Sequence, residues 1–364
     1  MSNIELGLDT FGDVTMDAGG RLQPQARVLR DVITEAELAD RVGVDFFGVG
    51  EHHRPDFAIS APEVLLGAIA GRTERLRLGT AVTVLSSDEP IRVYQRFSTL
   101  NAVSNGRAEV ILGRGSFTES FPLFGYSLDD FNVLFEEKLA IFAALRDADR
   151  TGQPVRWKGT VRPPLDGVRV YPPVEHPPLS TWVGVGGSPE SVVRAARYGF
   201  PLTLAIIGGD PRRFAPYVEL YHRALEQFGH GTLPVGIHSP GHIAETDAKA
   251  QAQLWPAYQV MRNRIGAERG WGPTSRAEFD QEIAVGSLYV GAPDTVARKI
   301  AGTVSALGAS RFDLKYSAGT LGHEIMLRSI ELYGGEVIPR VRQLISEAPV
   351  RAEENVVAGV ATKA

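Results

Sequence analysis

Cysteine is absent from this chain of 364 residues, as are clusters of basic residues and long apolar runs. The lack of cysteine excludes disulfides, thiolate metal ligands and a cysteine nucleophile, and with them a disulfide-stabilised extracellular scaffold. A formal net charge of −5 without a Lys/Arg cluster argues against a nucleic-acid-binding surface. No stretch reaches the roughly 18 apolar residues of a transmembrane helix, and the first residues do not resemble a leader peptide. We therefore expect a cytoplasmic protein without nucleic-acid or membrane partners.

The chain does contain a regular alternation of short apolar strands and amphipathic helices. Its composition, 43% hydrophobic and 22% charged, is ordinary for a globular protein and allows one large barrel or two medium domains. Eight strand–helix units without an interdomain linker favour a single closed α/β barrel, the (β/α)8 or TIM barrel, over a doubly wound open sheet. We expect one barrel domain over residues 1–347. The predicted strands are 4–9, 44–50, 76–84, 107–113, 179–185, 201–207, 234–239 and 311–316.

Two insertions and a tail interrupt this alternation. Between residues 153 and 178 two short β-like runs, 155–161 and 168–171, lie among prolines, which predicts a hairpin. Residues 266–291 are rich in Gly, Arg and Glu and predict a long loop, which is either a lid or a plain surface excursion. Residues 348–364 are small and polar, and we expect a mobile C-terminal tail.

The predicted strand 44–50 ends abruptly in three titratable residues, Glu51, His52 and His53. In parallel α/β folds the C-terminal ends of the strands converge on one crevice, where catalytic groups collect. Adjacent histidines at a strand end are equally often surface or supporting residues. In an extended chain they point to opposite sides, and no second His or Glu stands at metal-ligand spacing from them, so we expect no metal site.

Two glycine-rich turns suit an anion. Residues 113–115 (Gly-Arg-Gly) place Arg114 beside exposed backbone N–H groups, although such a turn is often only a tight bend. The turn formed by Gly186, Gly187 and Ser188 opens a helix, with Ser191 in its first turn. Helix N-termini carry unpaired N–H groups and partial positive charge, so this turn is either a phosphate seat or simply a well-capped helix. It is not a dinucleotide-binding fingerprint, because the Gly-x-Gly-x-x-Gly pattern is absent.

In five motifs and in their order, the sequence resembles the bacterial luciferase-like flavin monooxygenases over residues 4–344. The motifs are Glu-His-His at 51–53, Leu-Gly-Thr-Ala-Val-Thr-Val-Leu at 78–85, Asn-Gly-Arg at 105–107 with Gly-Arg-Gly at 113–115, Val-Gly-Gly-Ser-Pro at 185–189 and Val-Gly-Ala-Pro at 290–293. The resemblance implies a (β/α)8 barrel with reduced FMN at its C-terminal mouth.

The resemblance also implies roles for residues at that mouth. Arg114 would bind the FMN phosphate together with Ser188, Ser191 and the Gly186–Gly187 turn. A non-proline cis peptide would lie under the flavin ring between Ala81 and Val82.

By the same resemblance His52 would be the catalytic histidine, since its imidazole can move one proton near neutral pH. His53 would contact the substrate or support His52, and Glu51 would fix the loop by hydrogen bonding.

The implied reaction is oxygenation of a small organic substrate by reduced FMN and O2. No nicotinamide-binding unit accompanies the barrel, so a separate flavin reductase would supply the reduced flavin. The resemblance also implies a homo-oligomer, because the family usually pairs barrels through outer helices. Two alternatives stay open, namely a deazaflavin-dependent hydride-transfer enzyme and a noncatalytic flavin-binding barrel. Nothing in the sequence selects the substrate.

Overall fold

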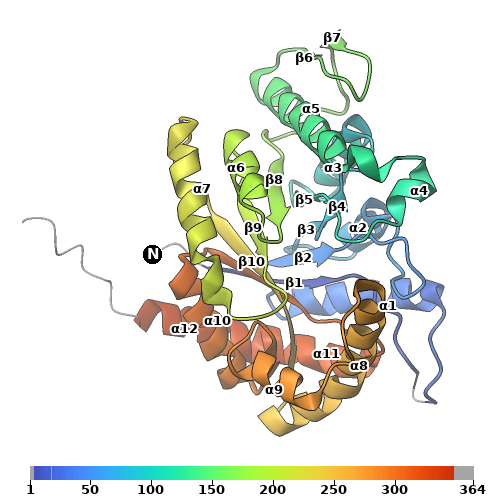
Figure 1. The fold of residues 1–364 in the computed structure, drawn as a ribbon, viewed down its shortest axis with the longest axis vertical. Coiled ribbons are helices and arrows are strands. Elements are labelled where there is room, and N and C mark those ends of the chain that lie inside the picture. The colour runs from blue at the N-terminus through green and yellow to red at the C-terminus, as the bar shows by residue number, and fades with distance from the viewer. Residues whose placement is uncertain (1–3, 18, 348–364) are drawn as a thin grey trace, which may run out of the picture.

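Eight parallel strands close into a barrel in the computed structural model, which describes residues 4–17 and 19–347 (Figure 1). Strand β10 pairs with both β9 and β12, and these pairings complete the ring. The predicted single (β/α)8 barrel is therefore confirmed, and the open-sheet alternative is wrong. The expected tail at 348–364 lies outside the described residues. The barrel strands are β1 (Glu5–Thr10), β2 (Phe46–Val49), β3 (Arg77–Thr80), β5 (Ala108–Gly113), β8 (Ser180–Val185), β9 (Leu202–Ala205), β10 (Val235–Ile243) and β12 (Arg311–Lys315).

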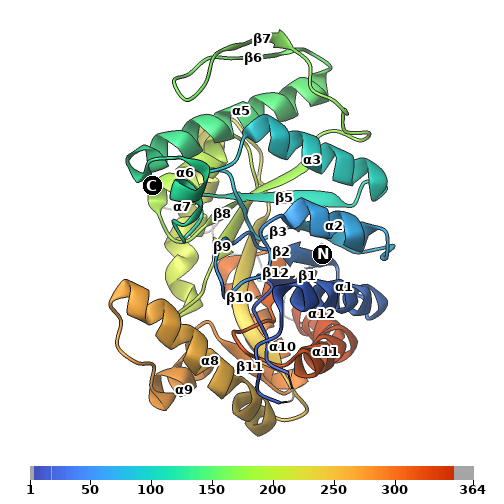
Figure 2. The same cartoon turned by 90° about the vertical axis from the view of Figure 1, so that its right-hand side faces the viewer.

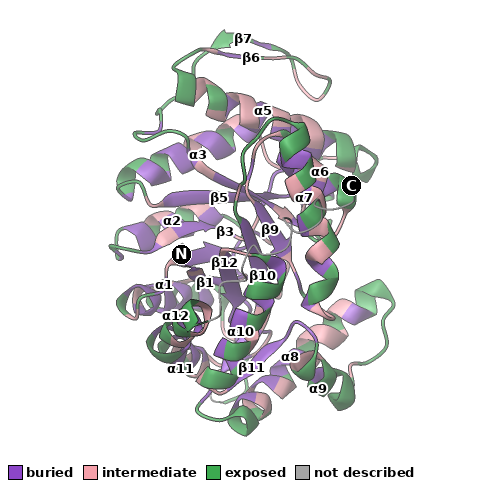
Figure 3. Cartoon of the chain, turned by 90° about the vertical axis from the view of Figure 1, so that its left-hand side faces the viewer, coloured by how far each residue is buried: buried purple, intermediate pink, exposed green. Residues whose placement is uncertain are grey.

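Helices surround the barrel, with their apolar faces turned to the strands. In α1, for example, Val28, Val32, Ala36 and Ala39 recur at three- and four-residue spacing and are buried. Figure 3 shows this division, with buried strands inside and exposed faces on the outer helices. No helix in the described part of the chain is long and apolar enough to cross a membrane. The main helices are α1 (Gln25–Arg41), α2 (Pro62–Ala70), α3 (Pro90–Val103), α5 (Phe131–Thr151), α6 (Pro189–Arg197), α7 (Ala215–Gln227), α8 (Asp247–Arg269), α10 (Pro293–Leu307), α11 (His323–Leu332) and α12 (Ile338–Glu347).

Shorter segments complete the connections between these elements. They are β4 (Thr83–Val84), α4 (Ser120–Phe124), η1 (Leu128–Asp130), β6 (Val155–Trp157), β7 (Leu165–Val168), η2 (Pro211–Phe214), α9 (Arg276–Ala284), β11 (Tyr289–Gly291) and η3 (Tyr333–Val337). The predicted strand 76–84 is thus two strands, β3 and β4, and the two residues between them, Ala81 and Val82, are joined by a cis peptide bond.

The predicted hairpin is formed by β6 and β7, which pair antiparallel outside α5 at one end of the molecule (Figure 2). The second strand begins earlier than predicted, and only Val168 of the expected 168–171 run belongs to it. Leu165 is buried and fixes the register, whereas Tyr171 is exposed and precedes Pro172, which has no N–H for a ladder.

The prediction of a long loop over 266–291 is wrong. Helix α8 continues to Arg269, α9 occupies Arg276–Ala284, and β11 pairs with the end of β10. A capping box begins α9: the Ser275 hydroxyl accepts from the Glu278 N–H, and the Glu278 carboxylate accepts from the Ser275 N–H. The sequence signal Ser-x-x-Glu was present at 275–278, and Phe279 anchors the helix by complete burial. A role for this region as a lid stays a prediction.

The bottom of the barrel is closed by Arg311, the first residue of β12. Its side chain is fully buried, pairs with Glu109 of β5, and donates from Nε to Asp313 Oδ2 at 2.8 Å. The guanidinium carbon lies 3.8 Å from the ring centroid of Phe46 and 5.0 Å from that of Trp182. Burial opposes the charge, but the two carboxylates outweigh it and raise the pKa of Arg311. The barrel is therefore plugged at its N-terminal end.

We predict that Arg311→Leu strongly destabilises the protein, because Glu109 and Asp313 would remain buried without their partner. The expected loss is about 3–5 kcal/mol of unfolding free energy. Arg77→Gln is the matched control, since Arg77 lies 3.7 Å from the same Glu109 but is one-third exposed, and its loss should stay below about 1 kcal/mol. Urea denaturation followed by tryptophan fluorescence measures both. Equal shifts of the two midpoints would contradict the role given to Arg311.

Candidate active site

A cavity of about 520 Å³ opens at the C-terminal end of the barrel. The ends of all eight barrel strands, or residues just beyond them, contribute to its wall, as does the C-terminal half of α8. Its size lies in the range of small-molecule and cofactor sites. Gly187 and Ser188 lie outside its lining. The predicted site residues that do line the cavity are His52, His53, Ala81, Val82, Arg114, Gly186 and Ser191.

His52 stands in an aromatic part of the cavity. Its ring centroid lies 4.6 Å from that of Phe11, 4.5 Å from Phe57 and 5.2 Å from Phe117. Burial lowers the pKa of His52 to about 3, although Asp13 opposes the shift. The imidazole is therefore neutral at neutral pH, and within the described chain neither ring nitrogen has a hydrogen-bond partner. A neutral, unengaged imidazole can accept a proton or pass one on.

Glu51 fixes the loop that carries both histidines, as expected. Its Oε2 accepts from the Val84 N–H at 2.9 Å, and its Oε1 lies 2.9 Å from His53 Nε2. Its own N–H donates to the Val82 carbonyl at 3.3 Å. His53 thus faces a carboxylate, unlike His52. This arrangement suits a supporting role for His53, and its catalytic role stays a prediction.

The expected cis peptide between Ala81 and Val82 is present. Both residues line the cavity, and the Val82 side chain packs against two glycines at strand ends. A Cβ on Gly113 would come within 2.4 Å of Val82, and one on Gly184 within 2.9 Å. These glycines therefore leave the space that Val82 occupies, which explains why β5 and β8 each carry glycine there.

One end of the cavity is suited to an anion. Arg114 donates a long hydrogen bond of 3.3 Å to Asn132 Oδ1 and lies 5.4 Å from the Phe131 ring centroid. Among the described residues it has no carboxylate partner within ion-pair distance. Burial, together with the nearby cation of Arg194, lowers the pKa of Arg114. A partly buried guanidinium without a counter-ion favours an anionic ligand.

The N-terminus of α6 completes this anion-binding end. Ser188 caps the helix, since its hydroxyl accepts from the Ser191 N–H at 3.4 Å, and Gly187 before it has φ +108°. No atom lies within 4 Å of a Cβ placed on Gly186, so the backbone there is open to the cavity. Sequence analysis missed two charges at this end: Glu190 accepts from the Ser188 hydroxyl at 2.7 Å, and Arg194 donates to the Ser191 hydroxyl at 3.3 Å.

Sequence analysis also missed a polar group deep in the cavity, formed by residues far apart in the chain. His238 Nδ1 lies 2.7 Å from Asp9 Oδ2, and Lys315 Nζ lies 2.8 Å from Asp13 Oδ2. Asp313 lies next to His238 in the parallel register. A signal was available, because Asp9, His238 and Lys315 are each polar residues near the C-terminal end of an apolar strand.

Charged contacts around Arg54 join several segments next to the cavity. Its guanidinium pairs with Glu119, with Asp56 at 3.1 Å and with Glu268 at the end of α8, and lies 4.5 Å from the Phe117 ring centroid. These contacts hold the loop after β2, the loop after β5 and α8 together beside His52. Arg54 therefore ties these three segments to one another.

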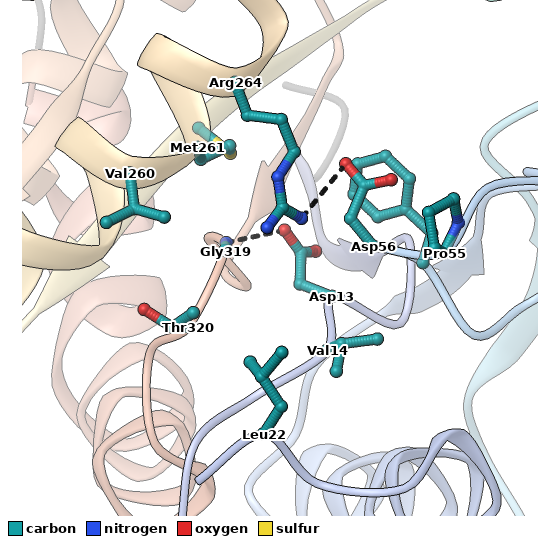
Figure 4. A pocket seen from close by; sticks show the side chains of 11 residues that line it. Asp13, Val14, Leu22, Pro55, Asp56, Val260, Met261, Arg264, Gly319 and Thr320 are labelled. Carbon is teal, nitrogen blue, oxygen red and sulfur yellow. Dashed lines mark hydrogen bonds and ion pairs between the residues drawn. The ribbon is translucent and has the colours of Figure 1, made fainter. Parts of the chain in front are cut away.

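A smaller recess of about 40 Å³ adjoins the cavity (Figure 4). It shares Phe57 and Met261 with the cavity wall. Asp13 lies in this recess, where its Oδ1 accepts from the Gly319 N–H at 2.7 Å while its Oδ2 binds Lys315. The recess thus lies against the ion pair at the back of the cavity. No cluster of three His, Asp or Glu able to hold a metal ion occurs among the residues described, and the absence of a metal stays a prediction.

A family model described as luciferase-like monooxygenase matches residues 11–311. The chain belongs to the luciferase-like monooxygenase family. It is 24% identical over 344 residues to the alkanal monooxygenase alpha chain of Photobacterium leiognathi, covering 86% of this chain and 94% of that one. Oxidoreductase activity is supported by this membership.

Two solved structures show the same fold. The FMN complex of the oxygenating constituent of 3,6-diketocamphane monooxygenase from Pseudomonas putida has a TM-score of 0.73 at 19% identity, covering 94% of this chain and 99% of that one. An F420-dependent secondary alcohol dehydrogenase has a TM-score of 0.71 at 18% identity, covering 93% and 99%. Solved structures with this fold therefore include an enzyme in complex with FMN and an enzyme that depends on F420.

We predict that Arg114→Gln weakens binding of FMN, because its phosphate would lose a charged donor at the end of the cavity. The dissociation constant should rise about 10- to 100-fold. Arg212→Gln is the control, since Arg212 is exposed on η2 away from the cavity lining. Quenching of flavin fluorescence during titration measures both. Unchanged affinity in Arg114→Gln would contradict the phosphate assignment.

Proposed function

We propose that this protein is an FMN-dependent monooxygenase acting on a small organic substrate. Reduced FMN would supply the two electrons with which O2 is split, one oxygen atom entering the substrate and the other leaving as water. The observation that carries the proposal is the pairing, in one cavity, of an anion-binding end, where the guanidinium of Arg114 has no carboxylate within ion-pair distance, and a neutral, unengaged His52 among aromatic rings.

The residues present fit FMN. Arg114 and the first turn of α6 offer charge and N–H groups to a phosphate, with the Ser188 and Ser191 hydroxyls beside them. Ala81 and Val82 offer an apolar surface for a flat ring. The aromatic wall around His52 would exclude water from the reacting atoms. His52 would then move one proton during the reaction.

We also propose the partners that this function needs. A separate flavin reductase would deliver reduced FMN, since the described residues form one barrel and hold no second, nicotinamide-binding unit. A homo-oligomer remains an expectation from the resemblance alone.

The deciding experiment is an anaerobic titration of the protein with oxidised FMN, reduced FMN and reduced F420, followed by admission of O2. We expect preference for reduced FMN and consumption of O2 when a substrate is present. Binding of F420 alone, with hydride transfer to or from an alcohol or ketone and no O2 uptake, would replace the proposal with the deazaflavin alternative. Binding of FMN without turnover of any substrate would favour the noncatalytic alternative.

We predict that His52→Asn lowers kcat about 100- to 10,000-fold while the dissociation constant of FMN changes less than about two-fold. Because burial holds the pKa of His52 near 3, the residue stays neutral and should add no inflection to the kcat/KM profile between about pH 5 and 8. His176→Asn is the control, since His176 is exposed beyond the hairpin. Wild-type turnover in His52→Asn would remove His52 from the mechanism.

A further inference from the structure

Besides His52 and His53, the cavity is lined by a third histidine, His238, which the proposed function does not use. Asp9 on β1 binds its Nδ1 at 2.7 Å, and no atom of the described chain binds its Nε2. The residue is 9% exposed, and it lines the cavity. With Nδ1 held by a carboxylate, the ring is fixed and Nε2 is the nitrogen left for a ligand.

The surroundings of His238 are charged but balanced. Burial disfavours its charge, yet Asp9 and then Asp313 outweigh burial and raise the pKa of His238, with Lys315 opposing. The neighbouring strand β9 faces it with the uncharged Ala205. Asp9 Oδ1 is buried and has no partner among the described residues, so His238 is the group that compensates this carboxylate. The pair of Asp9 and protonated His238 therefore has no net charge, and its Nε2–H group is free to donate to a ligand.

His52 and His238 both lie beside the ring of Phe11. The Phe11 ring centroid is 4.6 Å from that of His52 and 6.1 Å from that of His238, which it faces at an interplanar angle of 13°. His52 has no charged partner in contact, whereas His238 has one. Surroundings that move the pKa values of two titratable groups apart suit the groups to different chemical roles.

We propose that His238, positioned by Asp9, donates a hydrogen bond from Nε2 to a neutral carbonyl oxygen of the substrate. This inference rests on the proposed monooxygenase function and names its substrate class: carbonyl compounds with an apolar body. A carboxylate is disfavoured because it would lie close to Asp9 and Asp313. The apolar body suits Phe11, Phe57 and Phe117 in the same cavity.

The chemical consequence is polarisation of the carbonyl group. Negative charge grows on the carbonyl oxygen when an oxygen nucleophile adds to its carbon, and a fixed donor stabilises that charge. The Nε2–H bond is not broken, so His238 binds the substrate directly while Asp9 acts as a positioning residue.

The test uses protein labelled with 13C and 15N in histidine, without flavin. His238 is assigned by the signal that disappears in His238→Gln. Cyclohexanone, methylenecyclohexane and cyclohexanecarboxylate are the probes, which share a ring and differ in the polar group. We expect cyclohexanone to shift the His238 signals and to bind about 10- to 100-fold more tightly than methylenecyclohexane. Absence of that shift, equal affinities, or tighter binding of the carboxylate would overturn the proposal.

Asp9→Asn separates positioning from a merely structural role. Without the carboxylate, burial governs, and the pKa of His238 should fall below its ordinary value. Because the donor is the protonated ring, the wild type should lose its preference for the ketone as pH rises through the raised pKa of His238, and Asp9→Asn should lose it at a lower pH. An unchanged pH profile in Asp9→Asn would overturn the role of Asp9. The labelled wild-type titration stands even if the variant fails to fold.

Failure of this inference is distinguishable from failure of the proposed function. Binding of reduced FMN and O2 uptake are measured on the same protein without the carbonyl probes. If FMN binds and the ketone leaves His238 unchanged, the substrate assignment falls while the monooxygenase proposal stands. If the ketone binds at His238 and FMN does not bind, the carbonyl contact of His238 stands while the monooxygenase proposal falls.

Discussion

The cavity depends on the buried ion pairs of Arg311 at the bottom of the barrel. Glu109 and Asp313 bind this guanidinium from β5 and from β12 itself, and the rings of Phe46 and Trp182 cover it. A buried charge is tolerated only when partners compensate it, so these side chains have little freedom to rearrange. The barrel is closed at this layer, and its cavity opens at the C-terminal end, where the ligand-binding residues lie.

Above that layer the cavity has three parts, which differ in charge and polarity. Arg114 and the start of α6 form an anion-binding end, aromatic rings surround His52, and Asp9 with His238 forms a compensated polar group. The residues of these parts come from the ends of several strands or from the segments that follow them. The barrel is thus a frame on which three kinds of binding are combined in one cavity.

The sequence predicted the frame well, because buried parallel strands and amphipathic helices leave periodic patterns. The strand ending in Glu51 and His52 was recognisable for the same reason, and so was the capped start of α6. Asp9 and His238 each stand as a polar residue near the end of an apolar strand, but their contact depends on the pairing of β12 with both β1 and β10, which no local pattern contains. The glycine and charge content of residues 266–291 predicts a loop, whereas the capping signal of Ser275 and Glu278 indicates the helix that forms there.

The most direct test of the account is a crystal structure of the protein with FMN bound under anaerobic, reducing conditions. We predict that the phosphate lies against Arg114 and the first turn of α6, with the ring over Ala81 and Val82 and one face turned to His52. A phosphate placed elsewhere, or a cavity that remains empty at saturating FMN, would contradict the central claim.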